Sequence, residues 1–103
     1  MRQKDLRRYS VSLKRVAGIY EAKNDLEKAL ALYLEGLETD RQLEYKYPQD
    51  IAYLDGYAAA AYDAGNLSGG KQRKKLFSLA YKIAAKNPDL PKCSQILNLF
   101  STK

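Results

Sequence analysis

The residues with the clearest chemical potential form a glycine-rich, basic stretch in the second half of the chain. Residues 65–72 read Gly-Asn-Leu-Ser-Gly-Gly-Lys-Gln, which differs from the phosphate-binding pattern G-x-x-x-x-G-K-[ST] at its last position. In that pattern, backbone N–H groups cradle the phosphates, the lysine reaches them and the final hydroxyl holds magnesium. Nucleotide binding is therefore the first chemistry to test.

Three features of the sequence argue against a nucleotide hydrolase. Gln72 replaces the hydroxyl residue, an alanine-rich helix precedes the loop instead of a strand, and no apolar strand ending in Asp supplies a second metal ligand. Residues 67–73 are similar to the signature of ATP-binding cassette ATPases, but such a domain needs far more than 103 residues. A weaker prediction remains, in which a helix N-terminus and nearby cations hold a sulfate or a phosphate group. That anion site would comprise Ser68, Gly69, Gly70, Lys71 and Arg73.

Other catalytic constellations find little support. The chain has no histidine, so Cys93, its single cysteine, lacks the usual activating base, and zinc clusters are excluded. Asp55 and Asp63 are about two helical turns apart, which does not suit a glycosidase pair. We therefore expect a protein that is not an enzyme and that uses no cofactor and no metal.

The charge distribution leaves three kinds of partner open. The net charge is +6, and basic residues group near the start of the chain and again at residues 71–75. Such clusters attract acidic proteins, nucleic acids or anionic surfaces, although a solvated helix face explains the same pattern. Binding of RNA or DNA phosphates is the alternative function, and it predicts an affinity that falls steeply with salt.

Apolar residues that recur at steps of three and four predict an all-α fold of about five helices. The first helix should run from Asp5 to Lys23, with a turn at Asn24-Asp25 in which Asp25 caps the next helix. The second should run from Leu26 to Tyr45 and end before Pro48. The predicted buried face of the first helix comprises Leu6, Tyr9, Leu13, Val16, Ala17 and Tyr20.

Three further helices should follow. Asp50 is the expected cap of the third helix, a turn at Gly65-Asn66 ends it, and Ser68 is the expected cap of the fourth. Small residues between Tyr57 and Tyr62 should let a neighbouring helix approach closely. Asn87-Pro88-Asp89 ends the fourth helix, and the last begins at about Pro91. The aromatic residues expected as interior spacers are Tyr20, Tyr33, Tyr57 and Tyr81.

A family resemblance follows from the first helix pair. Its apolar and small residues, Leu13, Val16, Ala17, Tyr20, Ala29, Tyr33, Gly36 and Leu37, resemble a tetratricopeptide repeat unit. The resemblance implies stacked antiparallel hairpins in a right-handed array, within a single domain of residues 1–103. Residues 5–47 would form the first unit, residues 49–87 a degenerate second unit, and residues 90–101 a capping helix.

The resemblance implies a protein-interaction module or adaptor that binds a peptide or protein segment, with an acidic partner favoured by the charge. Gly18 and Gly56 stand where a carboxylate clamp needs asparagine, which argues against that specialised mode. Two units leave apolar surface uncovered, so self-association through the first or last helix is also expected. The concave face would carry Lys14, Gly18, Glu21, Asp55, Ala59 and Tyr62.

Location is predicted from what the sequence lacks. No apolar segment has the length of a secretory leader or a membrane span, and an unpaired thiol suits a reducing compartment. We expect a cytoplasmic protein that does not bind membranes.

Overall fold

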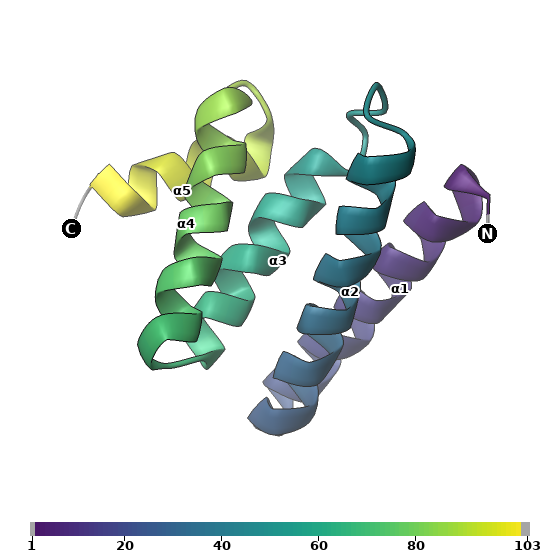
Figure 1. Ribbon diagram of the computed structural model, residues 1–103. Coiled ribbons are helices and arrows are strands. Elements are labelled where there is room, and N and C mark those ends of the chain that lie inside the picture. The colour runs from purple at the N-terminus through teal and green to yellow at the C-terminus, as the bar shows by residue number, and fades with distance from the viewer. Residues whose placement is uncertain (1, 102–103) are drawn as a thin grey trace. The chain divides into compact units, whose positions relative to one another are not determined.

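The computed structural model describes residues 2–101, which fold into five α-helices without a strand. The predicted all-α class is therefore confirmed. No helix in this range is long and apolar enough to cross a membrane. The helices are α1 (Gln3–Ala22), α2 (Leu26–Lys46), α3 (Leu54–Leu67), α4 (Gly70–Lys86) and α5 (Pro91–Ser101) (Figure 1).

The chain divides into two compact units, Met1–Tyr53 and Leu54–Lys103. In the first unit α1 packs against α2, and in the second α3 packs against α4, each as an antiparallel hairpin (Figure 1). Helix α5 contacts both α3 and α4. Each unit therefore buries its apolar residues between helices that are close in sequence.

The first hairpin has the turn and cap that the sequence predicts. Asn24 adopts the left-handed backbone conformation with φ 63°, which asparagine tolerates better than most residues. The Asp25 carboxylate then accepts a hydrogen bond of 3.4 Å from the Lys28 amide at the start of α2. The core between the two helices includes Leu6, Leu13, Ala17, Ala29, Tyr33, Leu37 and Leu43.

The second unit brings α3 and α4 close together through small residues. Ala58, Ala61 and Ala64 are completely buried, as the alanine run predicts. A Cβ atom added to Gly65 would lie 2.6 Å from the Phe77 ring, so only glycine lets this ring sit against α3. Gly65 is therefore an α3 residue under an aromatic ring. The turn predicted at Gly65-Asn66 lies about three residues further on, at Ser68-Gly69, within the longer turn at residues 67–70 that the degenerate second repeat also predicts.

Two predicted helix caps have other partners. The Asp50 carboxylate accepts from the Ala52 amide at 3.0 Å and from the Gln3 side chain at 2.5 Å, and α3 begins only at Leu54. The Ser68 hydroxyl donates to the Ala64 carbonyl at 2.8 Å, while Gly69 occupies the position before α4 and offers no side-chain cap. Both polar side chains therefore bond within the preceding segment or to α1 instead of capping the helix that follows.

Several residues predicted to be buried are exposed. Tyr33 and Tyr57 are buried as expected, but Tyr81 is 52% exposed. On α1, Tyr9 and Val16 are 42% and 41% exposed. The apolar repeat of α1 is wider than the single face that α2 covers, and residue spacing alone does not show which edge of the repeat stays in water.

Candidate binding surfaces

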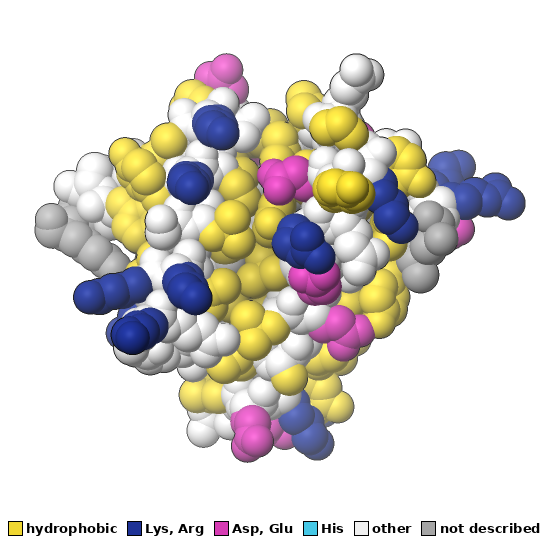
Figure 2. Space-filling model, viewed as in Figure 1, with side chains coloured by type: hydrophobic (Ala, Val, Ile, Leu, Met, Phe, Trp, Pro, Cys, Tyr) yellow, Lys and Arg dark blue, Asp and Glu magenta, His cyan; other side chains and the backbone are white. Residues whose placement is uncertain are grey.

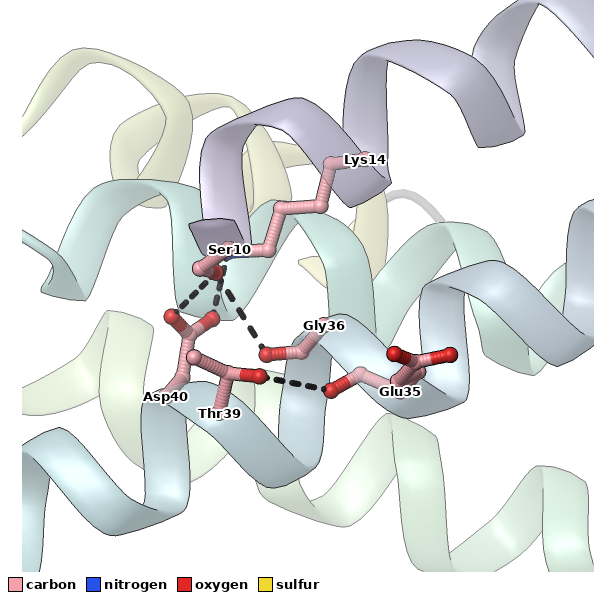
Figure 3. Close-up of polar contacts among 6 residues, drawn as sticks. All are labelled: Ser10, Lys14, Glu35, Gly36, Thr39 and Asp40. Carbon is pink, nitrogen blue, oxygen red and sulfur yellow. Dashed lines mark hydrogen bonds and ion pairs between the residues drawn. The ribbon is translucent and has the colours of Figure 1, made fainter. Parts of the chain in front are cut away.

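Lys14 is part of a buried polar cluster that joins α1 to α2 (Figure 3). Its ammonium group forms an ion pair and a hydrogen bond with the Asp40 carboxylate. The Ser10 hydroxyl donates to the other carboxylate oxygen of Asp40 at 2.6 Å. The Asp40 side chain is 1% exposed and that of Lys14 is 16% exposed. The positive charge predicted to meet a partner is thus compensated inside the first unit.

Gly36 makes room for this contact. A Cβ atom added to Gly36 would lie 3.2 Å from Cγ and 3.4 Å from Cε of Lys14. The lysine stem therefore crosses α2 at a position without a side chain. The absence of a side chain at Gly36 therefore lets the Lys14 ammonium reach Asp40.

The buried cluster changes the acidity of Asp40. Burial raises the pKa of the Asp40 carboxyl above its usual value, and the Lys14 ammonium and the Ser10 hydroxyl lower it only in part. The cost of removing the carboxylate from water is therefore the larger effect. The ion pair with Lys14 offsets part of this desolvation cost.

The other two α1 residues predicted for the groove lie beside Tyr33. The Tyr33 hydroxyl donates to the Glu21 carboxylate at 2.9 Å. A Cβ atom at Gly18 would lie 3.9 Å from the same hydroxyl, which is ordinary contact distance. Glu21 therefore satisfies the polar tip of a buried tyrosine, and Gly18 lies next to that tip.

Asp55 binds the N-terminus of α5. Its carboxylate accepts from the Lys92 amide at 3.2 Å and from the Cys93 amide at 2.9 Å. Leu90, the residue before α5, has no side-chain acceptor, so Asp55, which is 37 residues before Lys92, caps the helix instead. Burial and the nearby Asp55 carboxylate raise the pKa of the Cys93 thiol to about 11, so this buried side chain stays protonated at neutral pH.

Tyr62 belongs to an aromatic cluster in the second unit. Its ring centroid lies 5.4 Å from that of Phe77 and 5.7 Å from that of Phe100. Tyr81 extends the cluster, 5.8 Å from Phe100. Ala59, the remaining predicted groove residue, is half-buried on the same helix as Tyr62. The six predicted groove residues thus come from α1 and α3 in different units, and their shared surface stays a prediction.

The predicted anion site lies at the junction of α3 and α4. Gly70 begins α4 with a left-handed φ of 57°. The Arg73 guanidinium donates to the carbonyls of Ser68 at 2.8 Å, Gly65 at 3.1 Å and Asn66 at 3.3 Å. These carbonyls lie at and just after the C-terminus of α3, where the helix dipole favours a cation. Arg73, although exposed, is therefore engaged with backbone oxygens, whereas Lys71 is exposed and forms no ion pair within residues 2–101.

The structure adds a surface that the sequence did not single out as one face. Helix α4 carries six basic side chains and no acidic one. Within residues 2–101 none of its five lysines forms an ion pair. Four of these lysines share one exposed face at helical spacing, and a shallow depression is lined by Lys74, Lys75, Ser78, Leu79 and Lys82. We define the α4 lysine face as Lys71, Lys74, Lys75, Ser78 and Lys82.

The α4 lysine face could have been predicted from the sequence by counting the charges of each expected helix. The sequence shows the cluster at residues 71–75, but Lys82 joins it only when the helical spacing is extended one turn beyond Ser78.

Among residues 2–101 no group of three acidic, cysteine or histidine side chains could hold a metal ion. No family model, curated protein or solved structure matches this chain, so the repeat resemblance stays a prediction from the sequence.

Proposed function

We propose that the chain is a non-catalytic protein-interaction module that binds an acidic segment of a partner protein along the α4 lysine face. The observation that carries the proposal is the uncompensated charge of this face. Figure 2 shows basic side chains gathered along α4 in the view of Figure 1. Other strongly basic parts of the chain, such as the start of α1, mix acids with their cations, whereas α4 does not.

The position of these lysines is unfavourable for the folded chain alone. Lys71, Lys74 and Lys75 lie in or near the first turn of α4, at the positive end of the helix dipole. Lys71 and Lys75 are also four residues apart, so their charges repel each other across one helical turn. Each effect costs a few tenths of a kcal/mol, roughly, when exposed to water. Carboxylates from a partner would relieve both.

A protein segment suits this face better than a nucleic acid. Leu79 lies half-buried in the depression between Lys75 and Lys82, and it offers an apolar contact beside the charges. The arginine of this helix, the side chain best suited to phosphate, is engaged with α3 carbonyls. The expected ligand is therefore an acidic peptide with an apolar side chain.

The proposal can be tested with a fluorescent twelve-residue peptide rich in Glu and containing leucine. We expect the double variant Lys74→Glu with Lys82→Glu to bind it about tenfold more weakly. The matched control, Lys4→Glu with Lys46→Glu, changes the net charge equally at exposed lysines of the first unit and should keep the wild-type affinity. Equal losses in both variants, or no binding at low salt, would overturn the proposal. Tighter binding of single-stranded RNA than of the peptide would favour the nucleic-acid function instead.

A further inference from the structure

Helix α1 carries an exposed stripe beside its contact with α2, and from this stripe the Tyr9 hydroxyl reaches α2 by donating to the Glu35 carboxylate. We define the α1 seam as six residues at spacings of four, three, four, three and four. The three apolar members, Tyr9, Val16 and Ile19, are 42%, 41% and 54% exposed. The seam consists of Asp5, Tyr9, Ser12, Val16, Ile19 and Lys23. Alternating steps of three and four are the pattern by which one helix packs along another in a coiled coil.

The seam is complementary to itself in the antiparallel direction. Its spacings read the same from either end, and its centre falls at residue 14. When two copies are related by a two-fold axis at that centre, Tyr9 faces Ile19 of the second copy and Ser12 faces Val16. A two-fold interface needs this reciprocity, in which each residue meets a partner that meets it in return.

Charge distinguishes this pairing from the parallel one. Asp5 and Lys23 close the two ends of the seam, both are exposed, and neither forms an ion pair within the described residues. In the antiparallel arrangement, Asp5 of each copy lies opposite Lys23 of the other. A parallel arrangement would place like charges together at both ends, which is unfavourable.

We infer that α1 is a homodimerisation surface, on which a second copy of this chain packs antiparallel through the α1 seam. Small Ser12 lies beside the two-fold axis and lets the helices approach closely. Six seam residues per copy form a small interface, so the dimer is weak and depends on concentration. This inference uses a different helix from the α4 lysine face and does not depend on the proposed function.

Sedimentation equilibrium between about 10 µM and 1 mM tests the inference, because weak dimers dissociate in that range. We expect Val16→Asp to weaken dimerisation by at least about tenfold, since it places a charge in the apolar seam. The matched control is Val11→Asp, because Val11 is 47% exposed on the same helix but lies outside the seam. A strict monomer throughout the range, or equal effects of both variants, would overturn the inference. Circular dichroism of each variant confirms that it is folded.

A charge exchange tests the direction of packing. We expect Asp5→Lys alone and Lys23→Asp alone to weaken the dimer several-fold, because each places like charges at both ends of the interface. The double variant should recover the wild-type dimer. It also carries unfavourable charges at both ends of α1, so recovery does not come from a more stable helix. A double variant as weak as the single ones would exclude the antiparallel pairing.

Discussion

At the residue scale, the polar side chains that look available for a partner have contacts within their own unit. Lys14 neutralises Asp40, Glu21 accepts from Tyr33, and Asp55 accepts from the first amides of α5. Each of these contacts satisfies a group that would be costly to leave unpaired in a protein interior. Side-chain type alone therefore does not separate binding residues from structural ones in this chain.

Replacing Lys14 tests the role of the buried ion pair. In Lys14→Met, the Asp40 carboxylate loses the two interactions with Lys14 that lower its pKa, so the folded-state pKa rises further above the unfolded one. The unfolding free energy therefore falls as the pH rises through the folded-state pKa, because the buried carboxyl must then ionise without its partner. We expect a loss of about 2–4 kcal/mol in unfolding free energy near pH 8 and a smaller loss near pH 5. Urea unfolding at both pH values measures this difference.

The control for this experiment is Lys4→Met, which removes an exposed lysine of the same helix that forms no ion pair within residues 2–101. It should change stability little and without dependence on pH. A Lys14→Met variant that loses the same free energy at both pH values would show that Lys14 does not compensate a buried carboxylate.

Asp55 is expected to stabilise α5 as a cap from another helix. Asp55→Ala leaves two amides of the first turn without an acceptor, so we expect a loss of about 1–2 kcal/mol in unfolding free energy. Asp55→Asn should lose less, because its amide oxygen still accepts. Asp89→Ala removes an exposed acid of the same unit and serves as the control. If Asp55→Ala unfolds like this control, the cap does not contribute.

At the element scale, most helices follow from local sequence. The steps of three and four, the turn at Asn24 and the proline at the start of α5 predict α1, α2 and α5 within a few residues. The ends of α3 and the start of α4 were predicted less well. There Asp50 and Ser68 are good cap residues by type, but Asp50 accepts from Gln3 of α1, and the Ser68 hydroxyl donates to the Ala64 carbonyl four residues earlier.

The buried surfaces and the candidate site were less predictable for a similar reason. The sequence shows an acid, Asp40, in the apolar stripe of α2, but only packing shows that Lys14 reaches it. The contact between Asp55 and the amide of Cys93 joins residues 38 positions apart, which no local pattern indicates. Exposure of the α1 seam likewise depends on which edge of the helix α2 covers.

Helix α4 should become more stable when its first turn loses positive charge. Lys71→Glu places an acid near the positive end of the helix dipole and removes a repulsion with Lys75, so we expect a gain of about 0.5–1 kcal/mol in unfolding free energy. Lys86→Glu, at the last residue of the same helix, should have the opposite effect. Thermal unfolding of the two variants compares them directly. Equal shifts of the melting temperature in one direction would contradict the dipole argument.

At the scale of the whole molecule, the positive charge is concentrated in one unit. The first unit has ten basic and nine acidic residues, whereas the second has eight basic and three acidic ones. Five of the six net charges therefore belong to the second unit, and α4 supplies most of its cations. A field of this kind raises the association rate of acidic partners and falls with ionic strength.

The central claim is that an acidic segment binds along the α4 lysine face, and an amide-resolved NMR titration tests it most directly. With the leucine-containing acidic peptide, we predict that the largest chemical-shift changes fall on the amides of residues 70–86 and shrink as salt is added. Changes concentrated instead on Lys14, Glu21 and Tyr62 would contradict this account and assign binding to the groove predicted from the sequence. An absence of changes at low salt would contradict both.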